Sequence, residues 1–113
     1  RMGKVIGHIL NEPNADLSVK ELAKMASMSE RNFARKFTEE QGMSPAAFVA
    51  NARLDHVKYL LETTNLQIES IAYAAGYSGV ETLQRVFRNK LKTTPRAYRE
   101  RIAAKLMTSI QTV

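Results

Sequence analysis

The sequence predicts an all-α protein made of two similar halves. Apolar residues recur at helical spacing along the chain, and no stretch alternates as a strand does over more than a few residues. A motif of the first half also returns in the second. Leu22-Ala23 recurs as Ile71-Ala72 after 49 residues, and Pro45-x-x-Phe48 recurs as Pro95-x-x-Tyr98 after 50. The one-residue change in offset falls in a predicted turn, which indicates a repeat of packed structure.

Three helices are expected in the first half. An apolar stripe marks the first of them: Met2, Val5, Ile6, Ile9 and Leu10. Ser18 caps the second helix, and Glu21 three residues later completes a capping box. Ser29 caps the third helix, which is expected to run to about Gln41 and to stop at Gly42.

Four more helices are expected in the rest of the chain. Ser44-Pro45 starts a long fourth helix, with a cap followed by proline at the first helical position, and this helix reaches about Glu62. A short fifth helix repeats the apolar spacing of the second. The sixth covers about 79–91. Thr94-Pro95 starts the seventh, which is expected to end near Leu106 and to leave a frayed tail.

Each half has the layout of a helix-turn-helix, in which a short helix, a tight turn and a longer helix precede a helix that begins at proline. The turns are expected at Ser27-Met28-Ser29 and Gly76-Tyr77-Ser78, where Gly76 is free to take positive φ. The expected fold is therefore all-α, with two helix-turn-helix subdomains joined by a long linker helix. The first lobe covers about residues 1–43, the linker helix about 45–62 and the second lobe about 66–107.

Charge and composition limit the classes of partner and of site that the chain can have. The 113 residues include 17 Lys and Arg against 11 Asp and Glu, a net charge of +6. This excess favours a polyanionic partner, although a solvated surface explains it equally well. The absence of cysteine excludes disulfides and thiolate metal sites. No apolar run approaches the roughly 20 residues that span a bilayer, and the start, Arg1-Met2-Gly3-Lys4, lacks the apolar core of a signal peptide. A cytoplasmic protein fits best, and a chain that does not begin with Met is expected to be a fragment.

The longer helix of each half has one face suited to reading bases. Phe33 and Phe37 face the core, and Arg31 and Arg35 each lie two positions earlier, about 200° away around the helix. Arg85 has the same outward position in the second half. An arginine fork hydrogen-bonds guanine N7 and O6 together in the major groove. A surface salt bridge is the alternative role, but outward arginines at one position of a duplicated module favour DNA readout.

Three further residues share these faces. Ala34 either allows close approach or touches a thymine methyl, or is only a helix former. Glu81 either accepts from cytosine N4 or pairs with Arg85 four residues later, and both roles fit equally. Thr82 is a candidate contact to a base or a phosphate.

Basic residues and helix caps beside these faces are expected to contact phosphates. The basic residues are Lys36, Arg88, Lys90, Arg96 and Arg99. The caps are Ser29, Ser44 and Thr94. Each cation is equally explained as solvated, and capping alone explains the hydroxyl residues.

Together these motifs resemble the DNA-binding domain of AraC-type transcriptional regulators over about residues 17–102. The resemblance is carried by Leu22-Ala23, Ser29-x-Arg31-x-Phe33-x-Arg35-x-Phe37, Gly42-Met43-Ser44-Pro45, Arg53-Leu54, Leu60-Leu61, Ile71-Ala72, Gly76-Tyr77-Ser78, Arg85-x-Phe87, Thr94-Pro95 and Tyr98-Arg99. It implies two recognition helices in successive major grooves of double-stranded promoter DNA. The positions that it implies as base contacts are Arg31, Ala34, Arg35, Val80, Glu81, Thr82 and Arg85.

The resemblance has consequences for the whole protein. It implies a nucleoid-associated cytoplasmic regulator with no cofactor, and RNA polymerase as a partner if the protein is an activator. An effector would bind a missing N-terminal domain. The segment 81–85 is most similar to a subgroup whose N-terminal domain resembles a glutamine amidotransferase.

The linker and the two reading faces suggest an asymmetric site. A helix of about 18 residues spans about 27 Å, which suits recognition helices about 34 Å apart, one turn of B-DNA. Two different subsites about 10 bp apart are then expected. The first lobe is expected to be the more basic and the stronger reader, and the second lobe the more tolerant one.

Three residues depart from the family pattern. Ser27 replaces the usual turn glycine, Lys92 replaces the glycine that ends the sixth helix, and Gln67 stands where a Ser or Thr cap is usual. If Ser27 or Lys92 keeps positive φ, each costs about 1–2 kcal/mol. The second lobe is expected to be the less stable or more adaptable one.

Other functional classes fit less well. An enzyme or metal site is disfavoured, because His8 and His56 lie on different predicted helices and no nucleophile or phosphate loop accompanies them. A helical protein-interaction module is the main alternative, but it does not explain the repeated outward arginines. RNA binding usually needs exposed aromatic platforms, and most aromatic residues here fall on core faces.

Overall fold

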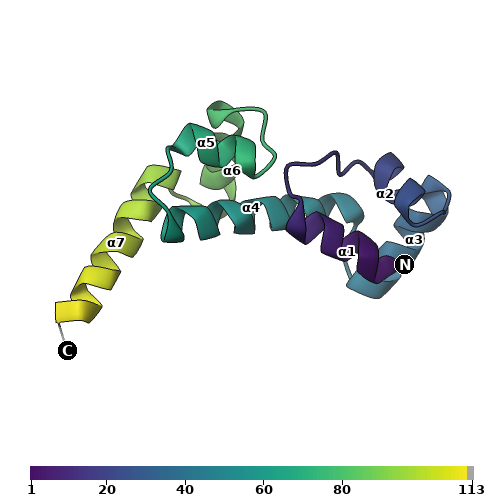
Figure 1. Cartoon of the computed structure of the whole chain (residues 1–113), viewed down its shortest axis with the longest axis horizontal. Coiled ribbons are helices and arrows are strands. Elements are labelled where there is room, and N and C mark those ends of the chain that lie inside the picture. The colour runs from purple at the N-terminus through teal and green to yellow at the C-terminus, as the bar shows by residue number, and fades with distance from the viewer. Residues whose placement is uncertain (112–113) are drawn as a thin grey trace. The chain divides into compact units, whose positions relative to one another are not determined.

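The structure, a computed structural model, describes residues 1–111 and contains seven helices and no strand within them (Figure 1). The all-α prediction is therefore confirmed. None of these helices is long and apolar enough to cross a membrane. The helices are α1 (Met2–Asn11), α2 (Val19–Met25), α3 (Glu30–Gln41), α4 (Pro45–Thr63), α5 (Ile68–Ala74), α6 (Val80–Leu91) and α7 (Pro95–Gln111).

The chain forms two compact units, one over Arg1–Asp55 and one from His56 onward. The boundary falls inside α4, so the first part of this helix belongs to the first unit and the last part to the second. The expected linker helix is thus shared between the units. Each unit contains one helix-turn-helix, α2–α3 in the first and α5–α6 in the second.

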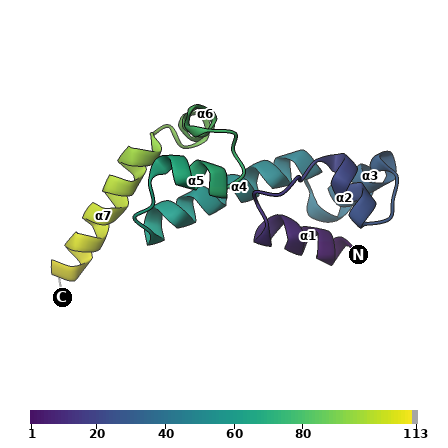
Figure 2. The same cartoon turned by 45° about the horizontal axis from the view of Figure 1, so that its top comes forward.

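The first unit has a single apolar core. It is formed by Val5, Ile9, Leu17, Leu22, Ala23, Ala26, Phe33, Phe37 and Val49. In both views α1 runs beside the first part of α4 (Figures 1 and 2), and Val49 shares the core with Val5 and Ile9. Leu10 was expected in the apolar stripe of α1, but it is 56% exposed. It lies about 100° around the helix from Ile9, away from the core.

The second unit repeats this arrangement with its own core. Its buried residues are Val57, Leu61, Ile71, Ala72, Ala75, Leu83, Phe87 and Pro95. An edge-on aromatic pair recurs at the repeated positions: Phe37 and Phe48 have ring centroids 5.4 Å apart at 82°, and Phe87 and Tyr98 lie 5.5 Å apart at 76°. The sequence repeat is therefore a repeat of packing.

The turn after the short helix closes in the same way in both units. The amides of Met28 and Tyr77 donate to carbonyls five residues earlier at 3.0 and 2.9 Å. This closure needs a left-handed residue just before the donor. That residue is Ser27 in the first unit, with φ 57°, and Gly76 in the second, with φ 95°. The expected positive φ of Gly76 is confirmed.

A second left-handed residue ends the longer helix of each unit. It is Gly42 after α3, with φ 75°, and Lys92 after α6, with φ 58°. Each unit thus has one glycine and one other residue at its two left-handed positions. The strain expected if Ser27 or Lys92 kept positive φ is therefore present once in each unit, so it does not by itself make the second lobe the less stable one.

The serine caps are confirmed, with one difference. Ser29 Oγ accepts from the Asn32 amide at 3.2 Å, and Ser18 Oγ accepts from the Glu21 amide at 3.3 Å. In a capping box the Glu21 side chain would accept from the Ser18 amide. This amide instead donates to Asp16 Oδ1 at 3.1 Å, so Asp16 takes the place expected for Glu21. This hydrogen bond lowers the pKa of the Asp16 carboxyl.

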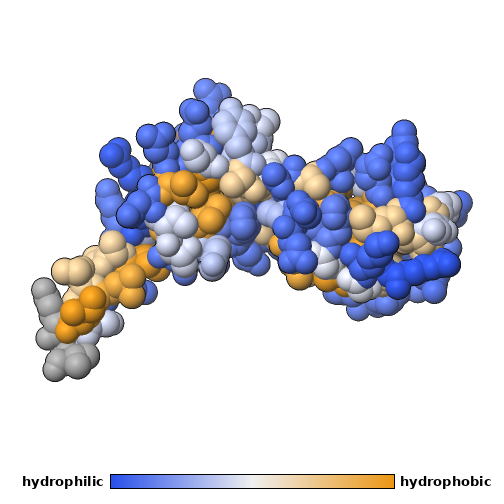
Figure 3. Space-filling model, viewed as in Figure 1, coloured by the Kyte–Doolittle hydropathy of each residue, from blue (hydrophilic) through white to orange (hydrophobic). Residues whose placement is uncertain are grey.

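The last helix is longer than expected. It continues to Gln111, so the expected end near Leu106 is wrong. No proline or glycine follows Pro95 up to that point, and the helix has no local signal to stop. Figure 3 shows apolar surface over the far end of α7, where Leu106, Met107 and Ile110 are exposed.

Candidate nucleic-acid interface

The outer face of α3 lies opposite two fully buried phenylalanines. Phe33 and Phe37 are 0% exposed, whereas Arg31 and Arg35 are exposed. Ala34, on the flank, is half-buried. The outward direction expected for both arginines is confirmed. Their contact with bases stays a prediction.

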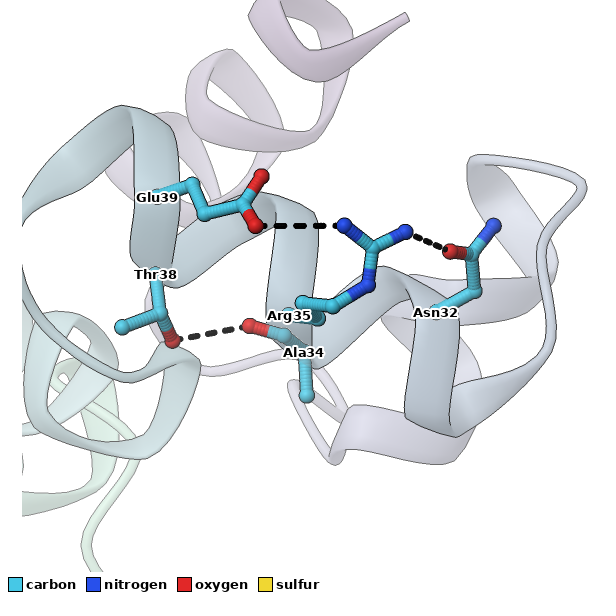
Figure 4. Close-up of polar contacts among 5 residues, drawn as sticks. All are labelled: Asn32, Ala34, Arg35, Thr38 and Glu39. Atoms are coloured by element: carbon cyan, nitrogen blue, oxygen red, sulfur yellow. Dashed lines mark hydrogen bonds and ion pairs between the residues drawn. The ribbon is translucent and has the colours of Figure 1, made fainter.

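Two side chains of the same helix hold Arg35 (Figure 4). Its Nη2 donates to Asn32 Oδ1 at 2.6 Å, and its Nη1 donates to Glu39 Oε1 at 3.1 Å. The salt bridge considered from the sequence is therefore present in the first unit. Asn32 and Glu39 were not predicted as partners of Arg35, although their spacing of three and four residues from it was the signal.

The outer face of α6 follows the same plan. Leu83 is fully buried, while Glu81 and Arg85 are exposed and Val80 is half-buried. No ion pair among residues 1–111 involves Arg85. The pairing of Glu81 with Arg85, one of the two roles considered for Glu81, is therefore not formed.

Thr82 has a local partner on the same side of the second unit. Its Oγ1 lies 3.2 Å from Ser78 Oγ, in the turn just before α6. The side chain is half-buried. The turn thus orients the Thr82 hydroxyl. Thr82 and Arg85 make no hydrogen bond to each other.

The three hydroxyl residues expected near phosphates all act as helix caps. Ser29, Ser44 and Thr94 each accept from the amide three residues later, at 3.2, 3.1 and 3.1 Å. Ser29 and Ser44 are exposed, and Thr94 is half-buried. Capping is confirmed, and contact with phosphate stays a prediction.

The basic residues in the expected phosphate set differ in how they are held. Lys36, Arg88 and Lys90 are exposed, and none of them forms an ion pair with another residue that the structure describes. Arg96 Nε lies 3.9 Å from Glu100 Oε1, and the two side chains are 87% and 73% exposed. Such a solvated pair is weak and leaves Arg96 available to another anion.

Arg99 has an internal role. Its guanidinium donates to three backbone carbonyls, those of Leu61 at 3.3 Å, Thr64 at 3.1 Å and Leu66 at 2.7 Å. These bonds use three of its five N–H donors. Arg99 therefore ties α7 to the loop between α4 and α5, and only its remaining donors are open to a phosphate.

Arg53 does the same in the first unit. It donates from Nε to the carbonyl of Pro13 at 3.0 Å and from Nη2 to that of Ala15 at 3.1 Å. In both units an arginine thus anchors the loop that leads into the helix-turn-helix. From the sequence, Arg53 was noted only within the family motif and Arg99 was also expected to contact phosphate. Neither anchoring role was predicted, since the carbonyls they bind lie 33 to 40 residues away.

The charge balance differs between the units. Residues 1–55 carry eight Lys and Arg against seven Asp and Glu, whereas residues 56–113 carry nine against four. The net charges are +1 and +5. The expectation that the first lobe is the more basic is therefore wrong. Long-range attraction to a polyanion is expected to be stronger for the second unit.

Residues suited to metal binding do not gather in the described part of the chain. No group of three His, Cys, Asp or Glu within residues 1–111 is placed to hold a metal ion. His56 is half-buried and stacks on Tyr59 with ring centroids 6.3 Å apart. His56 is therefore explained as a helix-surface residue.

The comparison with known families decides the assignment. A family model described as a helix-turn-helix domain matches residues 22–101. The chain belongs to the AraC-type helix-turn-helix family. This AraC-type domain is a sequence-specific DNA-binding domain of a transcriptional regulator, not an enzyme, and the protein-interaction module left open by the sequence is not favoured.

Curated relatives agree with this assignment. An HTH-type transcriptional regulator of Haemophilus influenzae is 32% identical over 103 residues, 91% of this chain and 35% of that protein. The RCS-specific HTH-type transcriptional activator RclR of Escherichia coli K12 is 31% identical over 102 residues, 90% of this chain and 36% of that protein. The AraC-type domain described here thus spans about a third of the length of these relatives.

Solved structures share the fold. The DNA-binding domain of AdpA, a global transcriptional factor in complex with a target DNA, has a TM-score of 0.87 and 29% identity, covering 92% of this chain and 94% of its own. A DNA-binding transcriptional dual regulator from Escherichia coli K-12 has a TM-score of 0.80 and 27% identity, covering 89% and 90%. The expected fold class is confirmed by these likenesses.

Proposed function

We propose that α3 and α6 of this AraC-type domain each read a separate subsite of duplex DNA from the major groove. One observation carries the proposal: two helices with fully buried inner faces each present an exposed arginine, Arg35 and Arg85, at the same repeated position. An arginine in this position can donate to guanine N7 and O6 together. A solved neighbour in the family, the AdpA domain, is bound to a target DNA, which supports duplex DNA as the partner.

The two subsites are read by different side chains in this proposal. The first set is Arg31, Ala34 and Arg35, and the second is Val80, Glu81, Thr82 and Arg85. The half-buried Ala34 and Val80 offer apolar contacts for thymine methyls, and Glu81, which has no ion-pair partner within residues 1–111, accepts from cytosine N4. The expected spacing of about 10 bp between subsites is part of the same proposal.

Phosphate contacts come from the exposed cations and the capped helix ends. Lys36, Arg88, Lys90 and Arg96 neutralise phosphates, Ser29, Ser44 and Thr94 present their helix amides, and Arg99 contributes its free donors. Lys36→Ala is expected to weaken every duplex alike and to reduce the salt slope of log K by about one. An unchanged slope would remove Lys36 from this set.

Selection of duplexes from a random-sequence pool provides the probe for the base contacts. Arg35→Ala and Arg85→Ala should each cost about 1–3 kcal/mol on the selected duplex and lose discrimination at one subsite only. Arg101→Ala removes an exposed arginine of α7 that lies outside the proposed interface, and it serves as the charge control. If both reading variants discriminate as the parent does, the assignment of these arginines is wrong.

For the whole protein, we propose a cytoplasmic, nucleoid-associated regulator whose effector binds outside the residues described here. RNA polymerase is its partner if it activates transcription. The similarity of segment 81–85 to the subgroup with a glutamine amidotransferase-like domain stays part of this proposal. Transcription in vitro from a promoter that holds the selected site, with and without the domain, distinguishes activation from repression.

A further inference from the structure

We propose that Glu39, together with Asn32, positions Arg35 for base reading and makes the first unit the more selective reader. The proposal rests on the proposed role of Arg35 as a base contact. The two residues flank the guanidinium, Asn32 Oδ1 at 2.6 Å from Nη2 and Glu39 Oε1 at 3.1 Å from Nη1 (Figure 4). The guanidinium is thus held at both terminal nitrogens along the outer face of α3.

These contacts leave Arg35 able to read a base. A guanidinium has five N–H donors, and each terminal nitrogen carries two. One donor on each terminal nitrogen is engaged, so three remain, including one on Nη1 and one on Nη2. A bidentate contact with guanine needs two. Glu39 and Asn32 therefore orient the group without using up its donors.

The pair acts on binding more than on folding. The Arg35 and Glu39 side chains are 58% and 60% exposed, so solvent screens their attraction in the free protein. A duplex that covers α3 excludes this water and strengthens the interaction. An arginine already confined to one orientation also loses less rotamer freedom when it meets a base.

The second unit lacks both partners at the repeated positions. Fifty residues on, Thr82 stands in place of Asn32 and Asn89 in place of Glu39. Thr82 Oγ1 is paired with Ser78, and no hydrogen bond or ion pair within residues 1–111 holds Arg85. Arg85 therefore samples more orientations than Arg35, and its subsite tolerates more base changes.

A competing role for Glu39 has a different signature. A carboxylate that merely repels phosphates weakens binding to every duplex by the same factor. Its removal then raises all affinities and leaves the ratio between two duplexes unchanged. A positioning residue changes that ratio, because only the duplex with the matching base uses the oriented Arg35.

The test measures selectivity as a ratio of two dissociation constants. One duplex is selected from a random-sequence pool by the parent domain, and the other differs by the single base pair at which Arg35→Ala loses discrimination. Glu39→Ala is expected to lower the ratio about three- to tenfold. Glu39→Gln, which keeps an oxygen acceptor, should retain more of the ratio than Glu39→Ala. Thermal unfolding checks that each variant is folded.

Two further variants complete the design. Glu40→Ala removes the same charge from an exposed neighbour that does not contact Arg35, so it should leave the ratio unchanged. Asn89→Glu places a carboxylate four residues after Arg85 and should raise selectivity at the second subsite about threefold. If Glu39→Ala keeps the parental ratio while Arg35→Ala loses it, this inference is overturned and the proposed function stands. If Arg35→Ala discriminates between bases as well as the parent at every position, the proposed function itself fails.

Discussion

The guanidinium of Arg99 donates to the backbone carbonyl of Leu66 at 2.7 Å, across 33 residues of sequence. Two more of its donors reach the carbonyls of Leu61 and Thr64. One side chain of α7 thus satisfies the Leu61 carbonyl, which the end of α4 leaves without a partner in the helix, and two carbonyls of the following loop. The start of the second helix-turn-helix therefore depends on this residue.

Arg99→Lys tests this anchoring role. Lysine keeps the charge but lacks the planar fork that reaches three carbonyls, so a loss of about 2–3 kcal/mol in the free energy of unfolding is expected. Urea unfolding followed by circular dichroism measures it. Arg96→Ala, a change at an 87% exposed side chain, is the control and should stay within about 0.5 kcal/mol. A variant that keeps parental stability but binds DNA less tightly would instead support the phosphate role.

Substitutions at the left-handed residues that end α3 and α6 are expected to have opposite effects on stability. Lys92→Gly is expected to raise the free energy of unfolding by about 1 kcal/mol, because glycine adopts φ 58° without the clash of a Cβ. Gly42→Ala should lower it by a similar amount. A Cβ at Gly42 meets no atom within 4 Å, so the loss comes from the backbone alone. Thermal unfolding measures both, and a stabilising Gly42→Ala would contradict the account.

The uncapped start of α5 offers a stabilising change. Gln67 has φ −63° and ψ 148°, close to the −63° and 153° of Ser18, but its side chain makes no cap hydrogen bond. Gln67→Ser is expected to raise the free energy of unfolding by about 0.5–1 kcal/mol, since the backbone already has the geometry of a serine cap. Gln67→Ala is the matched control, and equal stabilities for the two variants would refute the capping explanation.

Tyr98 predicts a loss of stability at high pH. Burial, with a hydrogen bond to Glu62, raises the pKa of Tyr98 to about 12 from its ordinary 10. In the unfolded chain the phenol ionises near pH 10, so the stability that this shift provides is complete below pH 10 and is lost between pH 10 and 12. Because the ring is only half-buried, about 1 kcal/mol or less is expected.

Denaturant unfolding at pH 8 and pH 11.5 checks this expectation. Tyr98→Phe should lose less stability between the two pH values than the parent. Tyr59→Phe, a change at a side chain 60% exposed, should lose as much as the parent does. A Tyr98→Phe variant with the full parental loss would assign the pH effect to other groups.

Most of the helix boundaries were predictable because their signals are local. Ser29 and Pro45 mark helix starts by their own hydrogen bonding and fixed φ, and Gly42 marks a stop by its left-handed backbone. The end of α7 was not predictable, since no such signal lies near Leu106. Leu10 was misplaced because periodicity defines an apolar stripe but not which edge of it the partner helix covers.

The duplicated all-α architecture and the outward directions of Arg35 and Arg85 follow from residue spacing alone, because the angle between helix positions depends only on that spacing. The contacts of the arginines, in contrast, depend on the folded chain. The carbonyls that Arg53 and Arg99 bind come from loops far away in sequence, and they converge on the guanidinium only after the chain has folded. The choice of rotamer that joins Arg35 to Asn32 and Glu39 likewise exists only in three dimensions, since helical spacing allows the contact but does not select it.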